Sequence, residues 1–130
     1  MRIRSAAVAA VTLLALAPAA TAVAESHPAP KRGLLLTVSG AEGTWIRGVG
    51  LQCGPRAGGG HPEARAACNA LTWARGDFDA LRGDPYPCTK EYDPVIATAD
   101  GTWRGRTVHW TKTFSNACVL DAETGPVFRF

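Results

Sequence analysis

The residues best placed to do chemistry lie in one proline-rich segment, residues 84–94, which reads DPYPCTKEYDP. Its prolines exclude a helix, because each lacks an amide donor, and they favour extended backbone in the residue before them. Cys88 can tether this segment covalently, and Lys90 offers a long cationic side chain two residues later. The segment is therefore predicted to be a stiff, tethered loop that presents one lysine.

Such a loop can enter a protease active site, because proteases bind their substrates as extended strands. It inhibits when it is stiff enough to bind with little ordering entropy and when its cleaved ends stay together. A disulfide at Cys88, with Pro85, Pro87 and Pro94 on the flanks, would meet both conditions. Lys90 suits a trypsin-like specificity pocket, which carries an aspartate. On these residues alone, the alternative is an ordinary surface loop held by a disulfide.

The histidines offer a different function, a small hydrolase with an acid and a base around one bond. His27 lies in a segment without apolar periodicity, which leaves His61 and His109 as the candidate pair. A local hydrogen bond is the simpler role for His61, since it precedes a proline that starts a helix. No serine has a Gly-x-Ser-x-Gly setting, and phosphate and EF-hand loops are missing from the sequence. We therefore expect no catalytic residues, with the His61–His109 hydrolase as the alternative.

The four tryptophans offer a third function, a carbohydrate-binding platform. Trp103 and Trp110 differ by seven positions, so they would point to opposite faces of one ideal strand. Trp45 and Trp73 fall in different elements, and all four are expected to lie wholly or partly in the core. A zinc site is not expected, because no two cysteines have the two-to-four-residue spacing of such sites. The sequence predicts no metal and no cofactor.

The start of the chain, residues 1–24, has the order of a secretory signal peptide. Arg2 and Arg4 precede a short apolar run, which Pro18 interrupts and which is too short for the roughly 20 residues of a membrane span. We predict a secreted, extracellular protein, cleaved after Ala24 or Ala22 and not anchored in the membrane. Cleavage leaves 12 basic and 11 acidic residues. This balance gives no case for nucleic acid or a membrane surface as partner.

The four cysteines are an even number in a chain expected to be exported, which favours two disulfides. Three pairings are open, and we favour the sequential one, Cys53 with Cys68 and Cys88 with Cys118. Each bridge would stabilise the fold by about 3–4 kcal/mol in the chain-entropy treatment.

The pattern of the remaining residues predicts a mobile arm at 25–33 and one domain at 34–130. Strands are expected at 34–38, 45–53, 95–99, 102–113 and 127–130, with a hairpin turn at Asp100-Gly101. One helix is expected from Pro62 to Arg75, followed by a cap at Asp77. A second helix is expected at 115–123, ended by Gly125. The sum is an α+β fold, a five-stranded antiparallel sheet with two helices packed on one side.

The loop resembles the reactive-site loop of the Streptomyces subtilisin inhibitor family, over residues 88–95 (CTKEYDPV). The similarity continues at 100–106 (DGTWRGR), 113–118 (TFSNAC) and 127–130 (VFRF). Upstream it includes 34–38, 53–55 (CGP), 60–62 (GHP) and 67–68 (AC). The resemblance covers nearly all of the chain after the predicted signal peptide.

The resemblance implies the two sequential disulfides and a reactive bond between Lys90 and Glu91. The protease-binding residues would be Tyr86, Pro87, Cys88, Thr89, Lys90, Glu91 and Tyr92. It also implies a reversible, tight-binding inhibitor of subtilisin-like and trypsin-like serine proteases. The family fold has a five-stranded sheet and two helices. Its members pair as homodimers through sheet faces, which would explain the continuous apolar run at 34–36.

Overall fold

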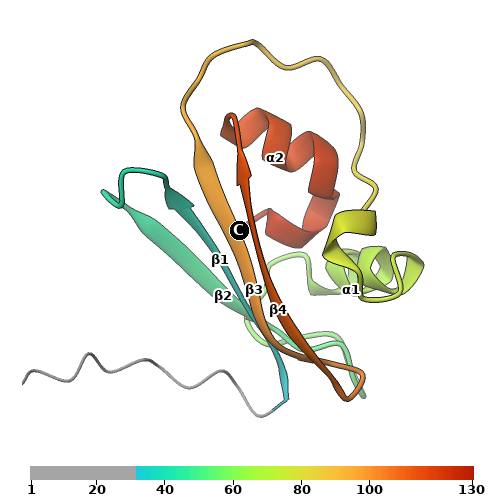
Figure 1. Ribbon diagram of the computed structural model, residues 1–130. Helices are drawn as coiled ribbons and strands as arrows, with labels where there is room; N and C mark the ends of the chain where they lie inside the picture. The colour runs from blue at the N-terminus through green and yellow to red at the C-terminus, as the bar shows by residue number, and fades with distance from the viewer. Residues whose placement is uncertain (1–31) are drawn as a thin grey trace, which may run out of the picture.

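A computed structural model describes residues 32–130 of the protein. The predicted signal peptide at 1–24 and almost all of the predicted arm at 25–33 lie outside this range. The strands are β1 (Gly33–Gly40), β2 (Ile46–Leu51), β3 (Val95–Trp103) and β4 (Arg106–Phe114). The helices are α1 (Ala64–Trp73) and α2 (Ala117–Thr124), with short 3₁₀ helices η1 (Phe78–Ala80) and η2 (Gly125–Phe128). Figure 1 shows the two α-helices on the same face of one twisted sheet.

Within residues 32–130 the sheet has four strands, in the order β2-β1-β3-β4, and every neighbouring pair is antiparallel. The prediction of a fifth strand at 127–130 is wrong, because Val127 and Phe128 are the last two residues of η2. Gly125 has a φ of 59°, and Pro126 follows it at the start of the 3₁₀ turn. Val127 and Phe128 are both buried, which a strand with one face on the core does not allow for consecutive residues.

The hairpin turn lies at Arg104-Gly105, not at the predicted Asp100-Gly101. Arg104 and Gly105 have φ values of 48° and 78°, which suits a tight two-residue turn between twisted strands. Gly101 serves a close approach of β1 instead, since a Cβ there would lie 2.2 Å from the carbonyl oxygen of Gly33. On the turn side β3 is therefore longer than the predicted strand at 95–99, and β4 begins later than the predicted strand at 102–113.

This change of turn places Trp103 and Trp110 on the same face of the sheet. Trp110 is opposite Ala99 in the ladder, and Ala99 and Trp103 are four residues apart on β3. The prediction of opposite faces was wrong, because it treated both tryptophans as members of one strand. Trp103 is buried, and Trp110 stacks on Phe128.

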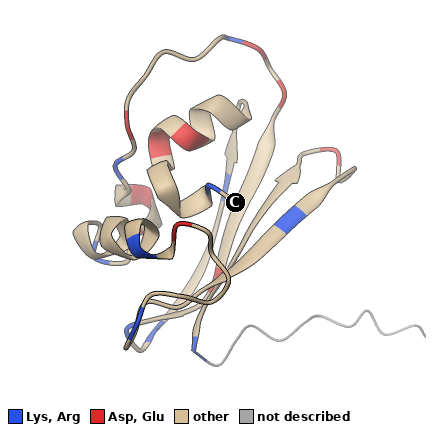
Figure 2. Cartoon of the chain, turned by 180° about the vertical axis from the view of Figure 1, so that it is seen from behind, with Lys and Arg blue, Asp and Glu red and all other residues tan. Residues whose placement is uncertain are grey.

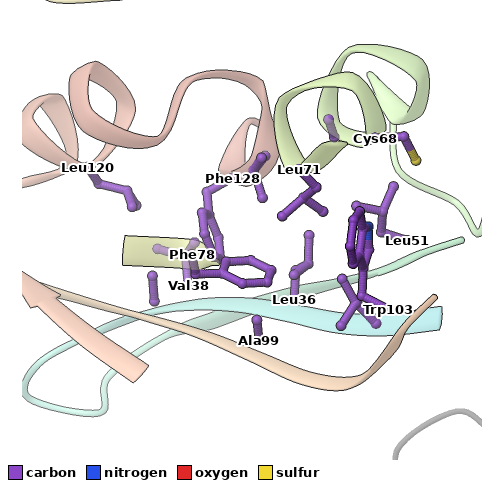
Figure 3. Close-up of a cluster of buried hydrophobic side chains, with 14 of the residues drawn as sticks. Leu36, Val38, Leu51, Cys68, Leu71, Phe78, Ala99, Trp103, Leu120 and Phe128 are labelled. Atoms are coloured by element: carbon purple, nitrogen blue, oxygen red, sulfur yellow. The ribbon is translucent and has the colours of Figure 1, made fainter. Parts of the chain in front are cut away.

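The core lies between this face of the sheet and the helices (Figure 3). In β1 the buried residues alternate along the strand: Leu34, Leu36 and Val38 face the core. The predicted apolar face of α1 is confirmed by the burial of Ala67, Cys68 and Leu71. The helices described within residues 32–130 cover one face of the sheet and leave the other face of β1 uncovered in the single chain.

The predicted ends of the helices agree well with the structure. After α1, Arg75 and Gly76 have positive φ values, and the Asp77 carboxylate accepts a hydrogen bond of 2.9 Å from the Asp79 amide. Gly125 caps the end of α2 as predicted. Both favoured disulfides form: the Cα atoms are 5.4 Å apart in Cys53–Cys68 and 5.8 Å apart in Cys88–Cys118. Over residues 32–130, no helix has the length and apolar character to cross a membrane.

Candidate functional site

The segment singled out by its prolines forms a long loop between η1 and β3. Figure 1 shows it as the yellow-to-orange arc that rises beyond α2. From Asp84 to Asp93 every residue is exposed except Cys88, which is half-buried. Figure 2 shows basic and acidic positions along this arc. The prediction of an exposed loop without helix or strand is confirmed.

The first tether of the loop is the Cys88–Cys118 disulfide. Cys118 lies in the first turn of α2, so the bridge joins the middle of the loop to a helix rather than to another loop. Because α2 packs on the core through the buried Leu120, the loop is fixed to a rigid part of the fold.

The second tether is Asn116, which the sequence did not single out. Its side-chain amide donates to the carbonyl oxygen of Glu91 at 2.8 Å and to that of Thr89 at 3.3 Å. Its side-chain oxygen accepts from the amide of Val119 at 2.9 Å and so caps α2. One buried residue, 7% exposed, therefore holds the backbone on both sides of Lys90.

One feature of the sequence could have pointed to Asn116: it is an asparagine at the expected start of a helix, two residues before Cys118. The sequence indicated a helix that begins near Ser115 and carries Cys118. Its second and third hydrogen bonds, to Thr89 and Glu91, could not be foreseen, because these residues are 27 and 25 positions away in the chain.

Backbone hydrogen bonds fix the loop where it enters β3. The amide of Asp93 donates to the carbonyl of Ser115 at 3.0 Å, and the carbonyl of Pro94 accepts from Ala41 at 3.0 Å. The second contact reaches the turn between β1 and β2. Residues after the Lys90–Glu91 bond are thus held by the sheet and by the start of α2.

The predicted site residues come together as consecutive parts of this loop. The side chains of Lys90, Glu91 and Tyr92 are exposed, and none forms a salt bridge with another residue in the range 32–130. Tyr86 differs, because its hydroxyl donates a hydrogen bond to the Asp121 carboxylate of α2. The loop therefore presents one cationic side chain to a partner, on a backbone that Asn116 and the Cys88–Cys118 disulfide hold in place.

The structure does not bring His61 and His109 together. His61 is 6% exposed: its Nδ1 accepts from the amide of Glu63 at 3.0 Å, so its Nε2 donates to the carbonyl of Val127 at 2.9 Å. His109 lies on the uncovered face of the sheet, with its side chain 83% exposed and paired with Asp100. The two rings are on opposite sides of β4 and β3, which removes the pair that the hydrolase alternative needs.

His61 is expected to stabilise the fold rather than to react. Replacing it with phenylalanine leaves the Val127 carbonyl and the Glu63 amide without their partner, so the free energy of unfolding should fall by about 1–3 kcal/mol. Denaturant unfolding measures this loss. The control is His109→Gln, which alters an exposed side chain and should change stability by less than about 0.5 kcal/mol. Equal effects of the two substitutions would contradict the structural role of His61.

The tryptophans divide into two kinds, which corrects the prediction that all four serve the core. Trp103 and Trp110 pack in or against the core, whereas Trp73 is 90% exposed and Trp45 partly so. Trp73 ends α1 on the side away from its buried residues, Ala67 and Leu71. The tryptophans therefore share no platform. Over the described part of the chain, no three His, Cys, Asp or Glu residues are grouped so as to hold a metal ion.

Comparison with known proteins gives a consistent result. A family model described as subtilisin inhibitor-like matches residues 29–116. Subtilisin inhibitor-like protein 5 of Streptomyces fradiae is 47% identical over 102 residues, which is 75% of this chain and 95% of that protein. A subtilase-type protease inhibitor of Streptomyces coelicolor is 46% identical over 120 residues, 88% of this chain and 82% of that protein.

A solved structure agrees with these sequence matches. Sermetstatin of Streptomyces caespitosus, crystallised in complex with Bacillus licheniformis subtilisin, superposes with a TM-score of 0.63 at 37% identity. The match covers 75% of this chain and 97% of sermetstatin. Because the family model matches residues 29–116 and the relatives are close to half identical, the chain belongs to the subtilisin inhibitor-like family.

Proposed function

We propose that the protein is a secreted, reversible inhibitor of subtilisin-like and trypsin-like serine proteases, and not an enzyme. Residues 86–92 would occupy the protease as a substrate does, with Lys90–Glu91 as the reactive bond. The observation that carries the proposal is the position of Asn116, whose amide holds the carbonyls of Thr89 and Glu91 on either side of Lys90. The predicted signal peptide at 1–24 supports export.

The proposed mechanism follows from what remains in place if the bond is cut. The protease serine would attack the Lys90 carbonyl, form an acyl-enzyme and release the amine of Glu91. Cys88 keeps the acyl side on α2, and Asn116 holds the carbonyl of Glu91 on the leaving side. The freed amine therefore stays next to the acyl group, where reattack is much faster than for a separate molecule. The bond re-forms, and net hydrolysis is slow.

The choice of target rests on Lys90 and on the relatives. A lysine suits a specificity pocket with an aspartate, as in trypsin-like proteases. Subtilisin is the partner in the sermetstatin complex, and the Streptomyces coelicolor relative is described as a subtilase-type inhibitor. These matches support subtilisin as the second target.

Titration of active subtilisin and trypsin with the purified protein tests this function. We expect activity to fall linearly and to reach zero when one inhibitor chain is present per protease molecule. Steady hydrolysis of the protein by both proteases, without an equivalence point, would sink the proposal.

We further propose that two copies pair through the uncovered face of the sheet. This face carries Leu35, Ile46 and Ile96, and at its centre the hydroxyls of Thr37 and Thr98 share a hydrogen bond. Ile46 is 70% exposed in the single chain. Burying such apolar side chains removes them from water, which favours association. A second copy would give the apolar run of β1 the cover that its own helices do not supply.

Replacing Thr98 with arginine is expected to separate this dimer, because it places two charges at the centre of the interface. Light scattering should give twice the mass of one chain for the wild type and the mass of one chain for the variant. Ala66→Arg is the control, since Ala66 is exposed on α1 behind the sheet. A wild-type protein that stays a monomer at high concentration would contradict the proposal.

A further inference from the structure

A group of four charged and polar side chains joins the upstream end of the loop to the helical layer. The hydroxyl of Tyr86 donates to one carboxylate oxygen of Asp121, and the Nε of Arg129 donates to the other. The same guanidinium forms an ion pair with Asp84 at 3.5 Å. One loop residue, Tyr86, thus contacts an acceptor on α2, and another, Asp84, contacts a cation from the C-terminal segment.

We infer that Tyr86, Asp121 and Arg129 form a third anchor of the reactive-site loop, which positions its acyl side. The Tyr86 hydroxyl acts as a positioning group through its hydrogen bond to Asp121, while the backbone of Tyr86 remains part of the segment 86–92 that enters the protease. The inference rests on the inhibitory function proposed above. It adds a set of residues that neither the sequence pattern nor the two other tethers required.

The loop needs side-chain anchors at this end because its backbone cannot provide them. Pro85 and Pro87 have no amide hydrogen, and no backbone hydrogen bond of the described chain involves residues 84–87. On an extended backbone, residues two apart direct their side chains to the same side. Asp84 and Tyr86 are such a pair, and both are directed to the Asp121–Arg129 ion pair.

Helix α2 provides all three anchors from one side. Asn116 caps it, Cys118 lies in its first turn, and Asp121 follows Cys118 by three residues. Residues three apart are neighbours on a helix surface, so the disulfide and Asp121 share one face. The anchors therefore follow the loop in order. Asn116 holds Glu91 and Thr89, Cys118 holds Cys88, and Asp121 holds Tyr86.

The charge states suit a lasting hydrogen bond. Burial favours a higher pKa for Asp121, but the hydrogen bonds from Arg129 and Tyr86 outweigh it, so the pKa is lowered from the ordinary 3.8. The hydrogen bond to Asp121 raises the pKa of Tyr86 above 10.0. The negative charge of Asp84 also raises the pKa of Tyr86. The pKa of Arg129 is raised by its hydrogen bond to Asp121 and, to a smaller extent, by the charge of Glu63. At neutral pH the acceptor is thus a carboxylate and the donor a neutral phenol.

The test compares Tyr86→Phe, Asp121→Asn and the double variant in two assays with subtilisin and trypsin. The first is the inhibition constant, and the second is the rate of cleavage between Lys90 and Glu91 in the complex, followed by mass spectrometry. Each single variant should be cleaved about tenfold faster, since a hydrogen bond to a charged group is worth about one order of magnitude. The double variant should be little faster than Asp121→Asn alone, because that substitution has already removed the carboxylate charge that strengthens the Tyr86 hydrogen bond. Glu123→Gln is the control, as it neutralises another carboxylate of α2, which pairs with Lys112 of β4 rather than with the loop.

A second measurement does not depend on a protease. Backbone order parameters of Tyr86 and Cys88 should fall from about 0.85 in the wild type to below about 0.6 in Tyr86→Phe.

A lowered pKa means that Asp121 stabilises the fold above pH 3.8 and loses this effect as pH falls through the lowered value. The difference in melting temperature between wild type and Asp121→Asn should therefore be constant near neutral pH and should become smaller as the pH falls below 3.8.

The outcomes separate the inference from the function on which it rests. A wild type that inhibits neither protease removes the proposed function, and the order parameters then decide whether the anchor exists. A wild type that inhibits, with Tyr86→Phe unchanged in cleavage and order, overturns the anchor. Normal behaviour of Tyr86→Phe with lost affinity in Tyr86→Ala assigns the tyrosine ring a direct protease contact instead.

Discussion

Trypsin should bind the Lys90→Ala variant more weakly than the wild type by about 4 kcal/mol, roughly a thousandfold, as expected for an interface hot spot. Lys90 is exposed and forms no salt bridge with another residue in the range 32–130, so its loss leaves the fold unchanged. Inhibition constants measure the loss of binding, and thermal unfolding shows that stability is kept.

Lys90→Met should shift the preference from trypsin towards subtilisin, because an apolar side chain does not pair with an acidic pocket.

Lys112→Ala is the matched control for this experiment, because it removes a lysine from β4 rather than from the loop. Lys112 pairs with Glu123 at the surface, where such a contact contributes little to stability. The control should inhibit trypsin as the wild type does. If both lysine variants lose the same affinity, general charge attracts the protease and Lys90 is not the residue that fills its pocket.

Asn116→Ala is expected to convert the inhibitor into a substrate. The substitution removes the hydrogen bonds to Thr89 and Glu91, so the Glu91 amine is no longer held beside the acyl-enzyme after cleavage. It also removes the cap of α2, at a cost of about 1 kcal/mol. Cleavage after Lys90 should become continuous, which mass spectrometry of a mixture with catalytic amounts of trypsin would show.

Asn116→Asp separates the two roles of this residue. An aspartate still accepts from the Val119 amide and caps the helix, but at neutral pH it has no hydrogen to donate to the two carbonyls. It should therefore match the wild type more closely in helix stability and resemble Asn116→Ala in its rate of cleavage. An Asn116→Asp protein that resists cleavage as well as the wild type would show that the cap alone matters.

Features that depend on neighbouring residues were predictable from the sequence. The prolines around Cys88 and Lys90 exclude helix whatever surrounds them, and the loop was therefore located correctly. The same holds for the helix that begins near Pro62 and for Gly125 after α2. The sequential disulfides were a preference among three pairings, and the structure confirms them.

Features that depend on distant residues were not predictable. Gly101 appeared to be a turn residue, yet its lack of a side chain serves the approach of Gly33 on a neighbouring strand. The alternation at Val127 and Phe128 looked like a strand, although both side chains are buried under α1 and α2. Asn116 and Asp121 gain their roles only when α2 lies under the loop, which the order of residues does not reveal.

The arrangement of the loop indicates how an exposed substrate-like segment can resist a protease. A flexible loop would lose ordering entropy on binding and would release its new amine after cleavage. Here the disulfide and Asn116 connect both sides of the Lys90–Glu91 bond to α2. Backbone hydrogen bonds of Asp93 and Pro94 fix the end of the loop where it enters β3. Rigidity on both sides of one peptide bond, rather than any reactive group, is the basis of the proposed inhibition.

Mass spectrometry of the complex with subtilisin, dissociated in acid, tests the reactive bond most directly. We expect two forms of the inhibitor: the intact chain, and a chain cut once between Lys90 and Glu91 whose parts remain joined by Cys88–Cys118. The isolated cut form should return to the intact form when mixed with fresh protease. Cleavage at a different bond, or progressive digestion into several fragments, would show that Lys90–Glu91 is not the reactive bond of an inhibitor.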